Sequence, residues 1–449
     1  MIAMLSVTRR TAVLTTLLVL LPAVLTGCTN GGSDGQPPPT PEAKQPSAKP
    51  APAQGLGDII VAGRAITGAE PTGHPKVPYR RTYTDGELYA AVTGYRSAAF
   101  GTSGLEAVHE DVLGPAARHR GRPPGTVVTS IDPATQRAAA EGLRGETGAA
   151  VALDVLSGRI RALVSAPSVD PATFGGSTPK DAEAWKKAQA DDDKPLLNRA
   201  LREAVTPGGV FQPVVAAAAV EHGLYASVDA PTRSPLAAGD PAPCENATLR
   251  TALRLSCANV FARVAADLGA DTLAATAETF GFNDDALAVP VRAAQSTFPR
   301  GDRSQKQLAA VANGLGDVTA TPLQAARIMA VLAAGGKQLH PSLVDHVTGG
   351  DGASRAPTVP PGTPRRVLRQ DTAEQLRSAL GPSETRSTWV AAPQGAHGGT
   401  GTAWTVSLAR TADGRPVAIA VCVTGVDGTA PAMRVAELMG EAARGTTGS

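Results

Sequence analysis

Hydroxyl and glycine residues are concentrated in the segment 398–403, Gly-Gly-Thr-Gly-Thr-Ala. The side chains of Thr400 and Thr402 can hydrogen-bond a peptide carboxylate, and the glycines leave the backbone open to an extended ligand strand. The Gly-x-x-x-x-Gly-Lys spacing of a phosphate loop is absent, and the neighbouring His397 reads as structural. A glycine-rich turn is the alternative, but a strand pattern and Trp404 follow directly. The segment is therefore a candidate peptide-binding strand.

A second segment, residues 206–213, reads Thr-Pro-Gly-Gly-Val-Phe-Gln-Pro and leads into the apolar run 214–220. The run predicts a buried helix that starts at this turn. At the turn, Gly209 has no side chain and Gln212 cannot take up a proton near neutral pH. Thr206 belongs to the loop before the helix, so its hydroxyl is displaced from the helix start.

These segments resemble the three motifs of the penicillin-binding protein transpeptidases, class B-like and of the actinobacterial type. The family pattern is N-R-A followed by P-G-S-x-F-K-P, then S-C-N-x-x-F-A, then K-T-G-T-A on the inner sheet edge. The resemblance places Gly209 at the acylated Ser, Gln212 at the Lys that helps to deprotonate it, and Gly399 at the Lys of the third motif. On this alignment the nucleophile, the base and a cation are all missing.

The second motif corresponds to residues 255–262, Leu-Ser-Cys-Ala-Asn-Val-Phe-Ala, and two registers are open. Aligned through Phe261, the sequence keeps Ser256, a candidate ligand-binding residue, and has Ala258 in place of the Asn. A shift by one residue would keep Asn259 and lose the Ser. We favour the first register, and either one loses a polar group.

The resemblance implies an α/β (α+β) fold of the penicillin-binding transpeptidase or serine β-lactamase-like type. A central antiparallel sheet with a helical lobe would follow a small α+β pedestal. The resemblance also implies a protein of the peptidoglycan system, because the family cross-links peptidoglycan through acylation by the D-alanyl-D-alanine stem peptide, and β-lactams acylate the same Ser. No cofactor is implied.

The altered motifs bear directly on activity, because deleting a catalytic nucleophile costs on the order of 10⁶ in kcat. Losses at three motifs favour a pseudo-transpeptidase that is not an enzyme and binds a peptidoglycan stem peptide or a cell-wall protein. The alternatives are an active D,D-transpeptidase or carboxypeptidase with a replaced nucleophile, and a non-covalent β-lactam binder.

Residues 1–28 read as a targeting segment, with Arg9 and Arg10 before an apolar stretch that ends in Leu-Thr-Gly-Cys28. This end resembles a bacterial lipoprotein processing site, which would lipidate Cys28; an ordinary signal peptide or an uncleaved anchor is the alternative. Residues 29–55 are Pro-rich and predict a disordered tether. The expected location is outside the cell, lipid-anchored to the outer face of the cytoplasmic membrane.

Composition and cysteine usage limit the remaining possibilities. The net charge is +2 over 449 residues with no basic block, which excludes a nucleic-acid partner. Neither a C-x-x-C motif nor clustered His residues occur, so no metal site is expected. Cys244 and Cys257 predict a disulfide, with free thiols as the alternative, and Cys422 reads as a core thiol. The predicted units are a pedestal over 56–125, a transpeptidase-like domain over 126–443 and a tail over 444–449.

Overall fold

The structure, a computed structural model, describes residues 55–115, 123–233, 244–355, 363–391 and 400–446. The targeting segment with Cys28, nearly all of the expected tether, and the sites His397 and Gly399 lie outside these residues. Within the described ranges, no helix has the length and apolar character that crossing a bilayer requires.

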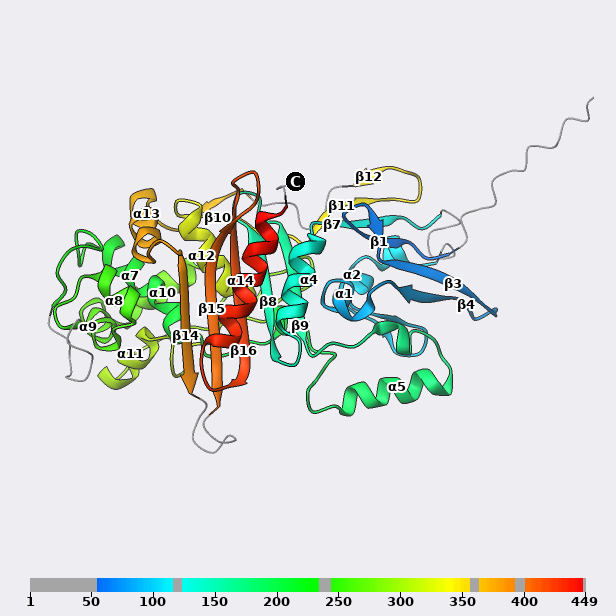
Figure 1. Cartoon of the computed structure of the whole chain (residues 1–449), viewed down its shortest axis with the longest axis horizontal. Coiled ribbons are helices and arrows are strands. Elements are labelled where there is room, and N and C mark those ends of the chain that lie inside the picture. Colours follow the sequence, from blue (N-terminus) through cyan, green and yellow to red (C-terminus); the bar gives the residue numbers. More distant parts are fainter. Residues whose placement is uncertain (1–54, 116–122, 234–243, 356–362, 392–399, 447–449) are drawn as a thin grey trace, which may run out of the picture. The chain divides into compact units, whose positions relative to one another are not determined.

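A five-stranded antiparallel sheet with the order β14-β15-β16-β8-β9 forms the centre of the fold (Figure 1). The apolar runs 149–153 and 159–164 predict a hairpin that turns at Gly158, and the runs 404–408 and 417–423 predict a second pair of strands joined by a turn at 413–416. Both hairpins are confirmed. The strands are β8 (Thr147–Asp154), β9 (Ile160–Ala166), β14 (Thr385–Ala391), β15 (Gly401–Arg410) and β16 (Pro416–Val426).

Alternate side chains of this sheet pack into two separate cores, because successive residues of a strand point to opposite faces. Ala420 and Cys422 of β16 belong to one core, while Ile419 and Val421 belong to the other. Helices α4 (Pro133–Gly142) and α14 (Ala430–Arg444) pack on one face (Figure 1), and α12 (Pro322–Ala333) packs on the other. Asp132 caps α4 by accepting from the Thr135 N–H, as the Asp-Pro start predicts.

A helical lobe lies beyond β14, and its central helix is α7 (Gln212–Glu221). Every residue of α7 from Gln212 to Val220 is buried, which agrees with its Ala- and Val-rich sequence. The 3-10 turn η3 (Gly208–Phe211) leads into it. The other helices of the lobe are α8 (Leu249–Leu255), α9 (Ala258–Leu268), α10 (Ala270–Thr279), α11 (Gln305–Ala312) and α13 (Gln370–Ala379).

A second sheet, with the order β12-β11-β7-β1-β2, draws its strands from distant parts of the chain. β1 runs parallel to β7, and β11 pairs with the other side of β7. The predicted pedestal segment 56–125 therefore shares one sheet with strands of the segment 126–443. These strands are β1 (Asp58–Val61), β2 (Arg64–Ala65), β7 (Thr126–Thr129), β11 (Val344–Thr348) and β12 (Ser354–Arg355).

A buried ion pair holds the N-terminal part together. The guanidinium Nε of Arg81 lies 2.6 Å from Oε1 of Glu106, and both side chains are fully buried. Arg96 contacts the same carboxylate at 3.0 Å. The remaining elements are β3 (Thr67–His74), β4 (Val77–Tyr83), α1 (Gly86–Thr93), β5 (Arg96–Ser97), β6 (Gly101–Thr102), α2 (Gly104–Val108), α3 (Glu110–Leu113), η2 (Pro171–Phe174), α5 (Pro179–Ala190), α6 (Arg199–Arg202), β10 (Lys337–Gln338) and β13 (Arg365–Arg366).

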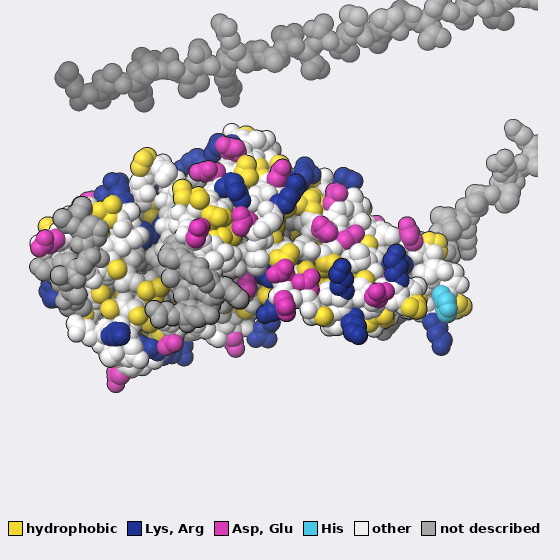
Figure 2. Space-filling view, turned by 60° about the horizontal axis from the view of Figure 1, so that its bottom comes forward, with side chains coloured by type: hydrophobic (Ala, Val, Ile, Leu, Met, Phe, Trp, Pro, Cys, Tyr) yellow, Lys and Arg dark blue, Asp and Glu magenta, His cyan; other side chains and the backbone are white. Residues whose placement is uncertain are grey.

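The surface carries charges of both signs. Figure 2 shows one face, on which Lys and Arg side chains alternate with Asp and Glu. This mixture agrees with the nearly balanced net charge of +2 and gives no one-signed surface on that face for a polyanion.

Candidate active site

The turn that the sequence singled out lies directly against the edge strand β14. Gly208 has φ +55°, and a Cβ there would approach Cγ2 of Val390 to 2.5 Å, so this position requires glycine. The backbone N–H of Gly209 points to Oγ1 of Thr388 at 3.4 Å. The position that the resemblance gives to the family nucleophile is therefore enclosed by residues of β14.

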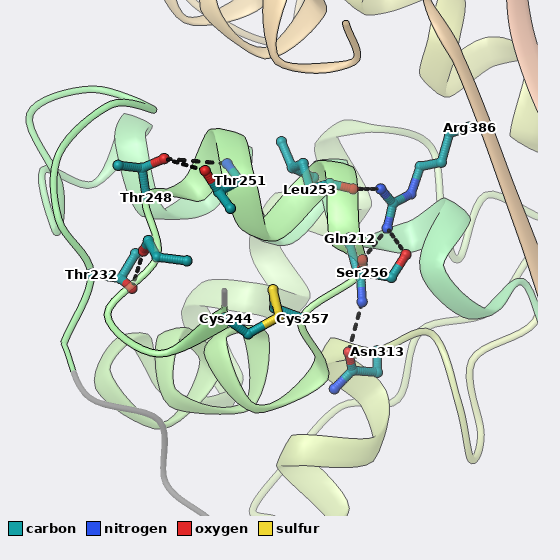
Figure 3. The surroundings of a disulfide bond; sticks show 11 residues. Gln212, Thr232, Cys244, Thr248, Thr251, Leu253, Ser256, Cys257, Asn313 and Arg386 are labelled. Carbon is teal, nitrogen blue, oxygen red and sulfur yellow. Dashed lines mark hydrogen bonds between the residues drawn. A yellow bond between two sulfur atoms is a disulfide. The ribbon is translucent and has the colours of Figure 1, made fainter. Parts of the chain in front are cut away.

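The side chain of Arg386 occupies the space beside Gly209. A Cβ built on Gly209 would lie 2.9 Å from Nη2 of Arg386. The Nε of Arg386 donates to the Gly209 carbonyl at 2.5 Å, and its Nη1 donates to the Leu253 carbonyl. Its Nη2 donates to Oε1 of Gln212 and, at 3.1 Å, to Oγ of Ser256 (Figure 3). One guanidinium thus connects the first two motif segments.

Gln212 is buried and fixed at both ends of its amide. Its Oε1 accepts from Arg386, and its Nε2 donates to Oδ1 of Asn313 at 2.8 Å (Figure 3). Asn313 in turn donates to the carbonyls of Ala258 and Ala309. The neutral amide of Gln212 therefore joins a hydrogen-bond network. It contacts the guanidinium of Arg386 on β14, whereas a Lys at this position would itself be the cation.

Ser256 is the hydroxyl that borders this network. It ends α8 in the left-handed conformation, with φ 56°, and the residue is exposed. Nη2 of Arg386 lies 3.1 Å from the Ser256 hydroxyl and 2.9 Å from the Cβ position at Gly209, so one nitrogen contacts the hydroxyl and borders the family's nucleophile position. Ser256 is the hydroxyl residue that the favoured alignment of the second motif, the one through Phe261, retains.

The disulfide between Cys244 and Cys257 lies next to Ser256 (Figure 3). It is the pairing expected from the sequence. The bond links Cys257, the residue directly before α9, to the loop that contains Cys244. Because Cys257 follows Ser256 directly, the bond restricts the backbone that presents the Ser256 hydroxyl. The free thiol of Cys422 is buried in the core, and burial raises its pKa.

Burial also affects the pKa of Arg386. Its side chain is 6% exposed, and its four hydrogen-bond acceptors are neutral oxygens. Removal from water lowers the pKa of Arg386 to about 10, which still leaves the guanidinium protonated at neutral pH. The site therefore contains a buried cation that can stabilise a developing negative charge.

The expected position of the third motif is wrong. The sequence placed the segment 398–403 on the inner edge of the sheet, but Thr402 and Ala403 belong to β15, the second strand. The edge is β14, because residues 385–391 form a strand of their own that pairs outside β15. Gly399 lies outside the described residues, and Thr402 stands opposite Val390 in the register. The peptide-binding role of Thr400 and Thr402 stays a prediction.

The expected loss of a cation is wrong for the same reason. Sequence reasoning missed Arg386, Thr388 and Asn313, although all three contact the motif residues. One signal was present: Arg386-Ser387-Thr388 is a cation followed by two hydroxyl residues, which resembles the K-T-G type of segment better than Gly399-Thr400-Gly401 does. The buried Trp404 fixes the loop before η3, since its Nε1 donates to the Thr206 carbonyl at 2.9 Å.

Two family models match this chain. The penicillin binding protein transpeptidase domain matches residues 148–437, and the penicillin binding protein A dimerisation domain matches residues 56–120. The chain is 32% identical over 342 residues to the peptidoglycan D,D-transpeptidase PbpA of Mycolicibacterium smegmatis, covering 69% of each protein. It is likewise 32% identical to PbpA of Mycobacterium tuberculosis over 331 residues, covering 67% of each.

Solved structures show the same relationship. The crystal structure of PBPA from Mycobacterium tuberculosis matches with a TM-score of 0.76 and 28% identity, over 87% of this chain and 99% of that one. Its penicillin G acyl-enzyme complex matches with a TM-score of 0.75 and 28% identity, over the same shares of the two chains. The predicted fold class is therefore confirmed.

The expectation that the chain is not an enzyme is overturned by these relatives, because they are named peptidoglycan D,D-transpeptidases and one of them forms acyl-enzyme complexes. That expectation rested on the altered residues at three motifs, Gly209 and Gln212, Ala258, and Gly399. The site nevertheless contains the Ser256 hydroxyl and the Arg386 cation. Because the matched transpeptidase domain spans residues 148–437 of 449, this chain belongs to the penicillin-binding protein transpeptidase family.

Proposed function

We propose that this chain is a peptidoglycan D,D-transpeptidase or carboxypeptidase that works through a non-standard site. Its substrate would be the D-alanyl-D-alanine end of a stem peptide, bound beside Ser256 between β14 and the start of α9. The observation that carries the proposal is the Ser256 hydroxyl, which lies 3.1 Å from the Arg386 guanidinium that borders Gly209.

Ser256 would act as the replacement nucleophile. Its Oγ would attack the carbonyl carbon of the penultimate D-alanine, and the amide C–N bond to the terminal D-alanine would break. The hydroxyl proton would pass to the leaving amine, and an ester would form at Ser256. An acceptor amine would then form the new amide and release Ser256, whereas water would release the shortened peptide.

Arg386 would stabilise the charge that develops during this attack. A buried guanidinium already oriented by the Gly209 and Leu253 carbonyls needs little reorganisation when an oxygen becomes negative. Gln212 cannot serve as a base, so we expect turnover to be about 10²–10⁴ times slower than with a general base in its place.

The proposal extends to location and ligands. Because β-lactams resemble the substrate of this family, the same hydroxyl would be acylated by penicillin. Lipidation at Cys28 would hold the protein at the outer face of the cytoplasmic membrane, as the sequence of the targeting segment suggests. Metabolic labelling with a radioactive fatty acid tests the anchor: we expect incorporation into the native chain and none into Cys28→Ala.

Fluorescent penicillin labelling of the purified protein tests the site. We expect a covalent label that survives denaturation in the native chain, and peptide mass spectrometry should locate it at Ser256. Ser256→Ala should lose the label, while Ser383→Ala, an exposed hydroxyl on the loop before β14, should keep it. Absence of label in the native chain, or a label on another residue, would contradict the proposal.

Product analysis separates the two reactions. With a stem peptide that ends in D-alanyl-D-alanine and no acceptor, release of D-alanine measures carboxypeptidase activity. Addition of an amine acceptor should convert part of the product into a cross-linked peptide if the chain is a transpeptidase. Saturable peptide binding without either product would support a non-covalent binder instead.

A further inference from the structure

A cavity of about 460 Å³ opens on the helical lobe, and its lining does not include the residues around Gly209. It lies between the end of α10, the loop 281–284, α12 and the two short strands β10 and β13. Its walls carry three arginines and two carboxylates, on residues Arg300, Arg327, Arg365, Glu278 and Asp284.

Arg327 is the buried cation of this cavity. Its side chain is 5% exposed, and its Nη1 donates to Oε1 of Gln324 at 2.7 Å. Within the described part of the chain, its Nε is buried and has no hydrogen-bond partner. Most buried polar groups in proteins are satisfied, so a guanidinium that served packing alone would be expected to find partners for its nitrogens.

The loop next to Arg327 is shaped to approach the guanidinium. Gly281 has φ +93°, and a Cβ there would lie 2.8 Å from both Nη1 and Nη2 of Arg327. Only glycine combines this backbone conformation with such a close approach. The backbone of Gly281 therefore lies close to the guanidinium of Arg327, at a position where any other residue would place a side chain against the guanidinium.

The charges that line the cavity do not cancel. Glu278 is neutralised by Arg300, whose Nε lies 2.6 Å from its Oε1. Asp284 then remains as the carboxylate that acts electrostatically on Arg327, and it lines the cavity together with Arg365. Burial lowers the pKa of Arg327 to about 10, Asp284 opposes this decrease, and the like charge of Arg365 adds to it. One positive charge remains in excess.

We propose that this cavity binds a phosphate group, held by the guanidiniums of Arg327 and Arg365. Arginine presents several N–H donors in a plane that matches the oxygens of phosphate. Two arginines match the charge of a phosphate dianion better than the single charge of a carboxylate ligand. Arg365 is placed by Nη2 hydrogen bonds to the Thr279 carbonyl and to Oε1 of Gln338, so it too is oriented before a ligand arrives. The group could belong to a soluble phosphate or to a phospholipid headgroup.

Titration of the purified protein with inorganic phosphate tests the proposal. At constant ionic strength, set with sodium chloride, the thermal midpoint should rise and saturate with phosphate. Arg365→Gln, at an exposed position that should not disturb folding, is expected to weaken phosphate binding at least tenfold. The matched control Arg303→Gln removes an arginine paired with Asp317 elsewhere on the lobe and should leave binding unchanged.

The ligand and its source are separated by two further measurements. Acetate should bind at least tenfold more weakly than phosphate; equal binding would overturn the phosphate assignment. Flotation with phosphatidylglycerol vesicles that inorganic phosphate displaces would support a lipid headgroup, and soluble phosphate binding without flotation would support a soluble ligand. A linear, unsaturated response, or the same affinity in Arg365→Gln, would overturn the site.

Discussion

Restoring a serine at Gly209 should destabilise this chain, because Arg386 already occupies the space. The new Cβ would lie 2.9 Å from Nη2 of Arg386, which is closer than real Cβ contacts. A guanidinium at the end of a long side chain could move at little cost if it were free. Here it is held by four acceptors, so the movement has to break hydrogen bonds.

The structure gives the size of this effect. A hydrogen bond to a charged group contributes about 1.5–3 kcal/mol, so losing one of the four lowers the free energy of unfolding by about 2 kcal/mol in Gly209→Ser. Removing the guanidinium should relieve the clash. Gly209→Ser combined with Arg386→Ala should therefore be about 2 kcal/mol more stable than the sum of the two single changes predicts.

Urea denaturation of the four proteins measures this coupling. Gly428→Ser is the matched control, because a Cβ at Gly428 meets no atom within 4 Å, and its stability should stay within about 0.5 kcal/mol of the native chain. Additive single changes, or a Gly209→Ser chain as stable as the native one, would refute the assignment of Arg386 to the nucleophile position.

Two further changes test other parts of the fold. Replacing both Cys244 and Cys257 by Ser should lower the free energy of unfolding by about 3 kcal/mol, because the bond closes a loop with a sequence separation of 13; dithiothreitol should weaken the native chain but not the double variant. Burial lowers the pKa of His109, so the folded chain binds a proton less readily than the unfolded chain, and stability should fall as the pH decreases from 7.5 through 6.5 toward the folded-state pKa. His109→Gln should reduce this fall in the thermal midpoint, whereas His346→Gln, at a half-exposed histidine, should not. Equal pH profiles for the native chain and His109→Gln would contradict the assignment.

Sequence periodicity and turn chemistry predicted the local elements well. The Asp132-Pro133 helix start, the hairpins of the central sheet and the helix that follows Gln212 are all present. Each of these depends on residues that are near one another in the chain. The same holds for Cys244 and Cys257, whose short separation made the disulfide a natural expectation.

The composition of the candidate site was harder to predict, because it depends on strand pairing. Arg386 reaches Gly209 only because β14 pairs outside β15, with Arg386 opposite Val406. The sequence-based alignment followed the letters Thr-Gly-Thr-Ala and so overlooked a short strand earlier in the chain. The role of Asn313 could not be predicted for a related reason: Asn313 directly follows α11 and contacts Gln212, which is distant in the sequence.

The order of strands in the second sheet bears on how the chain folds. β1 begins at Asp58 and pairs with Thr126, while β7 pairs on its other side with a strand that begins at Val344. The N-terminal part therefore cannot complete its sheet until most of the chain has been synthesised, and pairing over such separations slows folding. Until then β7 presents an unpaired edge, which is a site for misassembly. A chain shortened before Val344 would keep that edge open permanently.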